Sequence, residues 1–159
     1  MTVIKNGQPA DSAWLHLTDE ALPATGAITV SLDRWLKEKA ELGTRIEAVG
    51  VRLNACDSLD TLVQDVAALP IVVLDMEAFT DGRCFSQARL LRDRLGYTGE
   101  LRARGDFLRD QMFFLSRVGV NSFEFAEDTP LEDRLKAFAE FSVTYQSASD
   151  TPEPLYRRR

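Results

Sequence analysis

The sequence predicts an α/β domain with a mainly parallel sheet of about five strands that alternate with helices. Five short apolar segments alternate with segments whose apolar residues recur every three to four positions. Glycine, proline or a capping residue marks most junctions, which predicts short connections. The continuous apolar run Ile71–Met76 is typical of a parallel strand covered on both faces. A doubly wound sheet is the first interpretation, and a partial β/α barrel, which has the same local pattern, is the alternative.

The elements are predicted in the following order. A short N-terminal β element contains Asn6-Gly7, a pair typical of tight turns, between Thr2–Lys5 and the alternating segment Trp14–Leu17. The predicted strands are Ala27–Val30, Val49–Leu53, Ile71–Met76, Glu100–Ala103 and Ser122–Phe125. The predicted helices cover residues 31–43, 58–70, 85–95, 106–119 and 129–145. Residues 1–146 form one domain, and the polar, proline-containing residues 147–159 are predicted to be a disordered tail.

Length, composition and charge place the chain among soluble globular proteins. It has 159 residues, of which 45% are hydrophobic and 28% charged. A formal net charge of −6 argues against a general nucleic-acid-binding protein, which would present a basic face. No run approaches the roughly 20 apolar residues of a membrane span, and the N-terminus lacks the pattern of a signal peptide. We therefore expect a cytoplasmic protein without nucleic-acid or membrane partners.

Few residues in the sequence are suited to bind a metal or cofactor. Cys56 and Cys84 are isolated, and four-ligand zinc or iron–sulfur sites are not indicated. The single histidine, His16, lies among Trp14, Leu15 and Leu17 and is interpreted as structural. No glycine belongs to a dinucleotide-binding fingerprint or a P-loop. We expect no metal and no cofactor.

Polar residues follow the predicted strands, and in parallel sheets such residues gather on one edge, where ligands bind. These strand-end residues are Asn54, Asp57, Asp75, Glu77, Thr80, Asp81, Arg83, Arg104, Asp106, Glu124 and Glu127. Two of the connections place an arginine before a helix. Arg83 precedes a helix capped near Ser86, and Arg104 precedes one capped by Asp106. A helix N-terminus beside a guanidinium favours anion binding, because both donate hydrogen bonds.

The two arginine turns therefore predict a clamp for a small oxyanion such as phosphate, sulfate or sulfite. The predicted anion- or ligand-binding residues are Thr80, Gly82, Arg83, Ser86, Arg104 and Gly105. The candidate acid–base residues are Asp81 and Asp106. In the alternative interpretation, Asp81 pairs with Arg83 and Asp106 with Arg104, or the aspartates cap helices. Gly82 and Gly105 are expected to supply positive φ or close backbone approach.

The helix between Arg109 and Arg117 is apolar around more than half its circumference. Such a helix is either deeply buried or part of an oligomer interface. The candidate interface residues are Arg109, Met112, Phe113 and Phe114. Cys84 lies at a helix start beside Arg83, where a thiolate would be stabilised.

The motif FTDGR-x-F-S-Q-A-R-L-L-R-x-R-L-G-Y-x-G-E-L-R-A-x-G-D-x-L-R-D-Q-x-F-F-L resembles the bacterial family known as domain of unknown function 934. The resemblance is specific over Phe79–Phe125, and the upstream segments SLDRWL and VGVRL also fit. It carries the family's polar motif onto Thr80, Asp81, Gly82, Arg83, Ser86, Arg89, Arg104, Gly105, Asp106, Arg109, Asp110 and Gln111. At Cys84 the family more usually has a small residue, which argues against a catalytic thiol.

The resemblance implies an association with assimilatory sulfate reduction, because members are typically encoded beside sulfite reductase and labelled as oxidoreductases of sulfite reduction. Three functions stay open. The first is an accessory protein of sulfite reduction that binds a small oxyanion or docks on sulfite reductase or another sulfur-assimilation enzyme. The second is a small enzyme that acts on a sulfur oxyanion or a phosphorylated metabolite at the strand-end edge. The third is a structural homo-oligomer.

Overall fold

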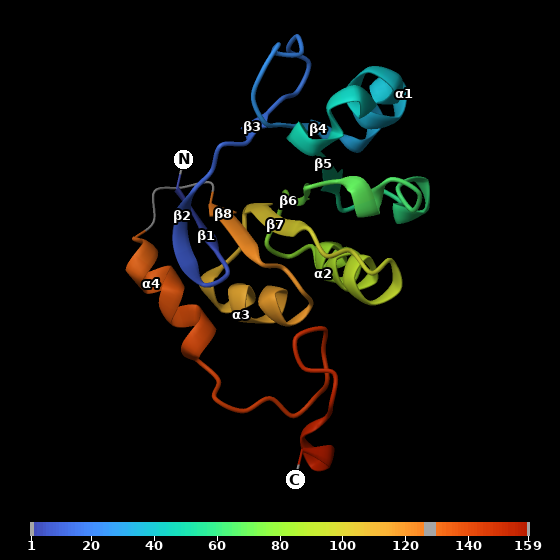
Figure 1. The fold of residues 1–159 in the computed structure, drawn as a ribbon. Coiled ribbons are helices and arrows are strands. Elements are labelled where there is room, and N and C mark those ends of the chain that lie inside the picture. The colour runs from blue at the N-terminus through green and yellow to red at the C-terminus, as the bar shows by residue number, and fades with distance from the viewer. Residues whose placement is uncertain (1, 126–129, 159) are drawn as a thin grey trace.

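The computed structural model describes residues 2–125 and 130–158, which form a curled sheet covered by helices (Figure 1). The sheet has eight strands in the order β2-β1-β8-β7-β6-β5-β4-β3. The strands are β1 (Thr2–Lys5), β2 (Gln8–Asp11), β3 (Leu15–His16), β4 (Ile28–Ser31), β5 (Val49–Asn54), β6 (Ile71–Met76), β7 (Glu100–Gly105) and β8 (Ser122–Phe125). All five predicted strands are confirmed, as β4 to β8, and three further strands precede them.

Strands β3 to β8 are parallel and lie beside one another in the order in which they occur in the chain. A doubly wound sheet reverses its strand order at one point, and the described strands show no such reversal. Successive crossovers of one hand place every helix on the same side, so the sheet curls around its free face. The doubly wound prediction is therefore wrong, and the half-barrel, its stated alternative, is the observed architecture.

The helices are α1 (Leu32–Leu42), α2 (Arg83–Arg89), α3 (Arg109–Arg117) and α4 (Leu131–Leu135). A π-turn, Leu90–Arg94, continues α2, and a 3-10 turn, Lys136–Ala139, continues α4. Ser31 caps α1 as predicted, since its side chain accepts a hydrogen bond from the Arg34 N–H. The capping residue predicted for the last helix, Thr129, and the strand-end residue Glu127 lie outside the described residues.

The helix predicted for residues 58–70 is replaced by two 3-10 turns, Leu59–Thr61 and Val66–Ala68. Ser58 still caps the first turn through the Asp60 N–H. Asp65, between the turns, accepts a hydrogen bond from Trp35 Nε1 at 3.1 Å and lies 2.8 Å from Lys39 Nζ. These contacts join the segment to α1. The apolar spacing predicted a regular helix here, and the structure has two short turns with tertiary contacts in its place.

The predicted N-terminal β element is a hairpin of β1 and β2. Asn6 (φ 51°) and Gly7 (φ 73°) form its two-residue turn, and Lys5 pairs with Gln8. The second strand is thus Gln8–Asp11, and the alternating residues after it supply β3, which pairs with β4 at the opposite edge of the sheet. Residues 12–17, here named the strap, therefore pass from one edge of the half-barrel to the other.

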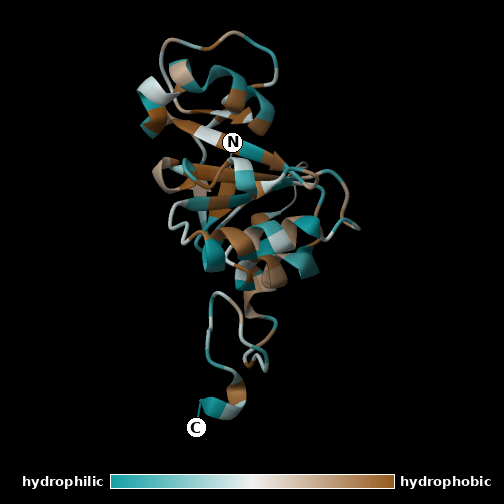
Figure 2. Cartoon of the chain, turned by 90° about the vertical axis from the view of Figure 1, so that its right-hand side faces the viewer, coloured by the Kyte–Doolittle hydropathy of each residue, from teal (hydrophilic) through white to brown (hydrophobic). Residues whose placement is uncertain are grey.

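The two faces of the sheet differ in chemistry. Alternate strand residues, such as Val72, Leu74, Leu101 and Phe123, join the hydrophobic core beneath the helices. Figure 2 shows these apolar strands in the interior and polar residues on the outer surfaces of the helices. Several of the residues that alternate with them, among them Glu100, Arg102 and Glu124, are buried and polar and point to the concave face. The concave face is where the fold assembles its charged side chains.

Within residues 147–158, the C-terminal end extends away from the body of the molecule (Figure 2), whereas Ser149 and Asp150 contact it. Ser149 Oγ donates to Asp93 at 2.7 Å, and the Asp150 carboxylate lies 3.5 Å from Arg117 Nε. Disorder of this segment in solution stays a prediction, as does the domain boundary at 146. In the described part of the chain, no helix has the length and apolar character needed to cross a membrane.

Candidate functional site

A row of polar side chains crosses the concave face at the carboxyl ends of four neighbouring strands. Strand register pairs Asn54 with Asp75, Asp75 with Arg104, and Arg104 with Glu124. We name these four residues the C-terminal row. All four line one cavity of about 470 Å³, together with Met76, Glu77, Gly105 and Phe125. This is the edge at which parallel α/β folds bind ligands, so the cavity is the candidate site.

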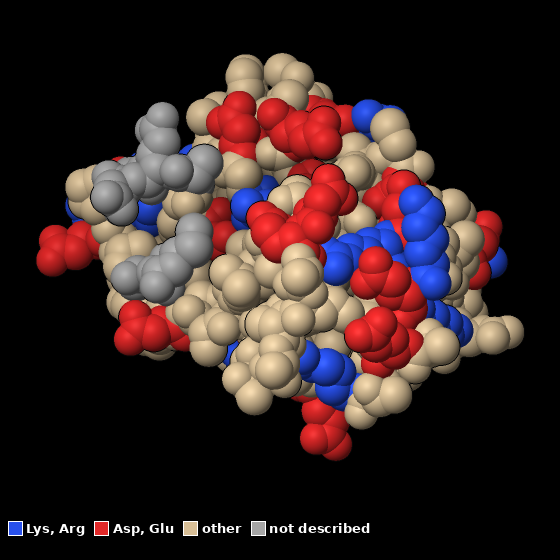
Figure 3. All heavy atoms as spheres, turned by 90° about the horizontal axis from the view of Figure 1, so that it is seen from above, with Lys and Arg blue, Asp and Glu red and all other residues tan. Residues whose placement is uncertain are grey.

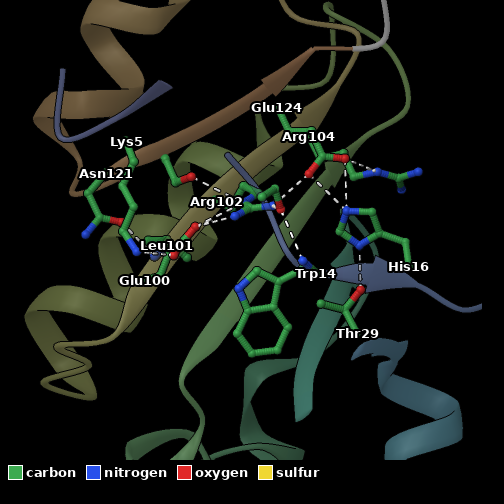
Figure 4. A network of polar contacts seen from close by, with 12 residues as sticks. Lys5, Trp14, His16, Thr29, Glu100, Leu101, Arg102, Arg104, Asn121 and Glu124 are labelled. Carbon is green, nitrogen blue, oxygen red and sulfur yellow. Dashed lines mark hydrogen bonds and ion pairs between the residues drawn. The ribbon is translucent and has the colours of Figure 1, made fainter. Parts of the chain in front are cut away.

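Beneath the row lies a buried ion network centred on Arg102 (Figure 4). Arg102 is 1% exposed; its Nη2 lies 2.6 Å from Glu100 and its Nη1 2.8 Å from Glu124. Lys5 Nζ, from β1, lies 2.6 Å from the other oxygen of Glu100. A buried charge is tolerated only when it is paired and hydrogen-bonded, and each of these groups is.

The strap is attached to the same network. Ser12 Oγ accepts a hydrogen bond from Arg102 Nη1 at 2.8 Å. His16 Nε2 lies 2.9 Å from Glu124, and His16 Nδ1 lies 2.6 Å from Thr29 Oγ1 (Figure 4). The histidine thus links the strap, β4 and β8, which agrees with the structural role predicted for it.

Glu124 is ionised by its surroundings. Burial alone would raise the pKa of this carboxyl, but hydrogen bonds and positive charge from His16 and Arg102 outweigh burial and lower its pKa to about 2. Burial acts in the same direction on Glu100, and Lys5 and Arg102 again reverse it, so the pKa of Glu100 is also lowered. Both carboxylates carry their charge at neutral pH.

Arg104 is the cation of the C-terminal row that reaches the cavity. Its Nη1 lies 2.9 Å from Asp75 and its Nε 3.0 Å from Glu124, while 35% of its side chain is exposed. No hydrogen bond to a described residue uses Arg104 Nη2. The guanidinium is therefore oriented by two carboxylates and keeps donors for a ligand.

A second arginine lies behind the row. Arg52 on β5 is 8% exposed, and its Nη2 donates to the carbonyl of Leu17 in the strap. Its Nε is buried and has no hydrogen-bond partner among the described atoms, although Asp75 Oδ2 lies 3.9 Å away. Burial lowers the pKa of Arg52, and the Asp75 charge opposes that effect. Asp75 therefore lies between two guanidiniums and is hydrogen-bonded to only one.

The other predicted turn has a different arrangement. Asp81 accepts hydrogen bonds from Arg83 Nη2 at 2.6 Å and from the Arg83 backbone N–H at 3.0 Å. These bonds lower the pKa of Asp81 to about 2. Arg83 Nη1 lies 3.0 Å from the sulfur of Cys56. The alternative interpretation of this turn, a local ion pair, is confirmed.

The turns do not place their arginines in the same cavity. Arg83 and Ser86 line a cavity of about 500 Å³ on the outer side, between α2 and the 3-10 segment after β5. Arg104 and Gly105 line the cavity on the concave side. Ser86 lies inside α2, whose N-cap is Gly82, and Thr80 is exposed in the preceding loop. The clamp was predicted from two similar sequence patterns, and the fold directs them to different sides.

The turn after β7 depends on its glycine. Gly105 has φ of 111°, and a Cβ there would lie 2.4 Å from the carbonyl oxygen of Met76. Gly82 has φ of −80°, and a Cβ there would have no atom within 4 Å, so the conformational role predicted for it is wrong. Asp106 is exposed and its N–H donates to the Met76 carbonyl at 2.8 Å. Leu108, not Asp106, is the N-cap of α3, so the predicted cap is wrong.

The candidate interface residues of α3 separate into two groups. Met112 is fully buried, and Phe113 is 9% exposed, so both belong mainly to the interior. Phe114 is 50% exposed; its ring meets that of Phe113 edge-on and lies tilted against that of Phe141. Arg109 Nη2 lies 2.7 Å from Glu140. An interface between copies of the chain stays a prediction.

Cys84, the candidate thiol at the start of α2, is not activated by its surroundings. Cys84 is 1% exposed, and burial raises its pKa to about 11, so it is a protonated thiol at neutral pH. No group of three or more histidine, cysteine, aspartate or glutamate side chains in residues 2–125 and 130–158 is arranged to hold a metal ion.

A family model matches a large part of the chain. The model described as bacterial protein of unknown function (DUF934) matches residues 50–156, about two-thirds of the chain. The chain belongs to this family. The matched region starts in β5 and contains β6, β7 and β8, the other three strands that build the row. No curated protein matches the chain significantly.

Several residues of the site were not predicted from the sequence. Arg52, Arg102 and His16 were absent from the predicted site because each reaches it through long-range contacts. One signal was available. In the segments Glu100–Gly105 and Ser122–Phe125, polar and apolar residues alternate although both strands lie inside a sheet. Such alternation in a covered strand indicates a polar face opposite the hydrophobic core.

Proposed function

We propose that the protein is an accessory protein of assimilatory sulfate or sulfite reduction that binds a small oxyanion in the cavity of the C-terminal row. The observation that carries the proposal is Arg104, a guanidinium fixed by two carboxylates at the strand-end edge with donors left over. The association with sulfite reduction rests on the family resemblance, and the anion site rests on the geometry.

The concave face is less acidic than the chain as a whole. Its strand residues carry four cationic side chains, Lys5, Arg52, Arg102 and Arg104, and three carboxylates, Asp75, Glu100 and Glu124. The whole chain has a net charge of −6, and acidic side chains are spread over the face seen in Figure 3. Counting Glu77, which also lines the cavity, the concave side carries as many cationic as anionic groups, and against an acidic outer surface this favours an anion at the uncommitted donors of Arg104.

Asp75 can exchange its hydrogen bond to Arg104 for one to Arg52, which would leave Arg104 available to a ligand. The carboxylate is hydrogen-bonded to Arg104 at 2.9 Å, and the unsatisfied Arg52 Nε lies 3.9 Å from its other oxygen. A shift of about 1 Å toward Arg52 would form a hydrogen bond of ordinary length there. The anion would then replace Asp75 at Arg104, and no buried donor would be left without a partner.

Calorimetric titration with sulfite, sulfate and phosphate tests the site. We expect wild type to bind at least one of them, and Arg104→Gln to lose at least tenfold in affinity. Arg104→Lys keeps the charge but not the two-pronged geometry, and we expect an intermediate affinity. Arg83→Gln is the matched control in the other turn and should bind like wild type. Equal losses in Arg83→Gln and Arg104→Gln would support a two-arginine clamp instead.

Growth of a deletion strain tests the physiological part. Rescue by sulfide but not by sulfite would place the protein at sulfite reduction, and wild-type growth on sulfate would contradict the proposal. Co-purification with sulfite reductase, compared between wild type and Phe114→Ser, tests docking through the exposed part of α3. Phe114 is chosen because half of its side chain is exposed and it lies outside the hydrophobic core cluster.

A small enzyme is the second candidate, since the cavity lies where α/β enzymes place catalytic groups. In that case the carboxylates that line the cavity are Asp75, Glu77 and Glu124, rather than the predicted Asp81 and Asp106. Turnover of a sulfur oxyanion or phosphorylated metabolite that Asp75→Asn abolishes would favour this candidate. A homo-oligomer without ligand would be indicated by a stable dimer in light scattering together with no anion binding.

A further inference from the structure

The cavity of the C-terminal row contains a negative charge that the ion network does not neutralise. Asp75 and Glu124 are each bonded to Arg104, and Glu124 also to Arg102. Glu77, the third carboxylate of the lining, is exposed and forms no hydrogen bond or ion pair with a described residue. It continues the alternation of β6 beyond Asp75, so it lies on the same side as the row. A ligand in this cavity meets a guanidinium and a free carboxylate.

Asn54 adds an uncommitted amide at the other end of the row. Its backbone groups bond to Asp57 and Gln87, but its side chain makes no hydrogen bond to a described residue. An amide offers both donors and an acceptor. The lining therefore presents donors for an anionic group at Arg104 and acceptors for a donor group at Glu77 and Asn54.

We infer that the ligand of this cavity is a small zwitterion, with an oxyanionic group at Arg104 and an ammonium group at Glu77. This inference rests on the proposed anion site and narrows its ligand class. A simple oxyanion would use Arg104 but would be repelled by the nearby charge of Glu77. An amino group on the same molecule turns that repulsion into attraction. The cavity volume of about 470 Å³ lies in the range of small-metabolite sites.

The second observation that points to a ligand is the buried Arg52. Its Nε is an unsatisfied donor on a side chain that is nine-tenths buried, and it faces Asp75, a member of the lining. Native structures rarely leave such a donor without a partner. When the anionic end of the ligand binds Arg104, Asp75 would move to Arg52 and accept a hydrogen bond from its Nε.

Matched pairs of sulfonates provide the test. Aminomethanesulfonate, 2-aminoethanesulfonate and 3-aminopropanesulfonate are each titrated against the parent alkanesulfonate of the same chain length, using the full chain. We expect at least one amino compound to bind about tenfold more tightly than its parent. Glu77→Gln should weaken binding of the amino compound and strengthen binding of the parent, because it removes both the attraction and the repulsion, and the advantage should disappear. Glu47→Gln is the control. Glu47 is exposed and precedes the amino-terminal end of β5, whereas the row lies at the carboxyl ends of the strands.

The outcomes separate this inference from the proposed function. If parent and amino compounds bind equally, and Arg104→Gln weakens both, the anion site stands and the zwitterion is wrong. If the amino advantage survives in Glu77→Gln, the assignment of the ammonium group to Glu77 is overturned. If neither sulfonates nor the inorganic oxyanions bind, the proposed function fails together with this inference.

Discussion

The two arginine turns, one before α2 and one before α3, look alike in sequence and differ in the fold. Arg83 finds its partner, Asp81, two residues away on an exposed turn. Arg104 finds Asp75 and Glu124 on the strands to either side, 29 and 20 residues away in sequence. The difference shows that an arginine paired within its own turn stabilises the local conformation of that turn. An arginine held by neighbouring strands is instead positioned over a cavity that those strands share.

Removing the negative charge of Glu124 should have the largest effect on the comparison. Glu124→Gln leaves buried Arg102 with one carboxylate fewer, and breaking a buried pair costs about 3–5 kcal/mol. Urea unfolding monitored by circular dichroism measures this loss. Asp81→Asn, the corresponding change in the exposed turn, should leave the urea midpoint unchanged. Similar midpoints for the two variants would contradict the distinction between the turns.

The second-largest difference is expected between alanine substitutions of the two turn glycines. Gly105→Ala forces a Cβ against the Met76 carbonyl at φ of 111°, and we expect a loss of about 2–3 kcal/mol in unfolding free energy. Gly82→Ala has room and an ordinary φ, so its urea midpoint should stay close to that of wild type. A larger loss in Gly82→Ala than in Gly105→Ala would mean that the turn conformations are assigned incorrectly.

The acid dependence of stability should come mainly from the concave face. The pKa of Glu124 is lowered to about 2, so its ionised form stabilises the fold above its unfolded pKa, and this contribution is lost as the pH falls from about 5 to about 2. The expected loss is about 3 kcal/mol, read from urea midpoints across this range. Glu124→Gln should show a shallower decline. Parallel curves for the two proteins would refute the assignment.

The smallest effect is expected from the exposed arginine itself. Arg83→Gln breaks an ion pair in which 59% of the Arg83 side chain is exposed, and such pairs are screened by solvent. Its urea midpoint should match that of wild type at an ionic strength of about 0.1 M. A clearly lower urea midpoint for Arg83→Gln would show that the contact of Arg83 with Cys56 contributes to the stability of the whole fold.

Local patterns in the sequence predicted much of the scaffold. The apolar runs located β4 to β8, and Asn6-Gly7 located the hairpin turn, because strand formation and tight turns depend on neighbouring residues. Strand order was not predictable in this way, since doubly wound sheets and half-barrels share the same alternation of strands and helices. The helix expected at residues 58–70 was wrong for a related reason, because contacts of Asp65 with α1 are long-range.

The site was predicted in part. Arg104 and Gly105 were found because they follow the predicted strand Glu100–Ala103, and Asp75, Glu77 and Glu124 were recognised as strand-end residues. All five line the same cavity. The pairing of Arg104 with Asp106 was wrong, because the positive φ of Gly105 separates their directions. Arg52 and His16 required the path of the strap over the concave face, which no spacing in the sequence reveals.

The most direct test of the central claim is a crystal structure grown with selenate, located by anomalous scattering from selenium. The account predicts an anomalous peak within hydrogen-bonding distance of Arg104, with Asp75 moved from Arg104 toward Arg52 Nε. The Arg83 turn should carry no comparable peak. A peak at Arg83 with the Arg104–Asp75 contact unchanged would contradict the account.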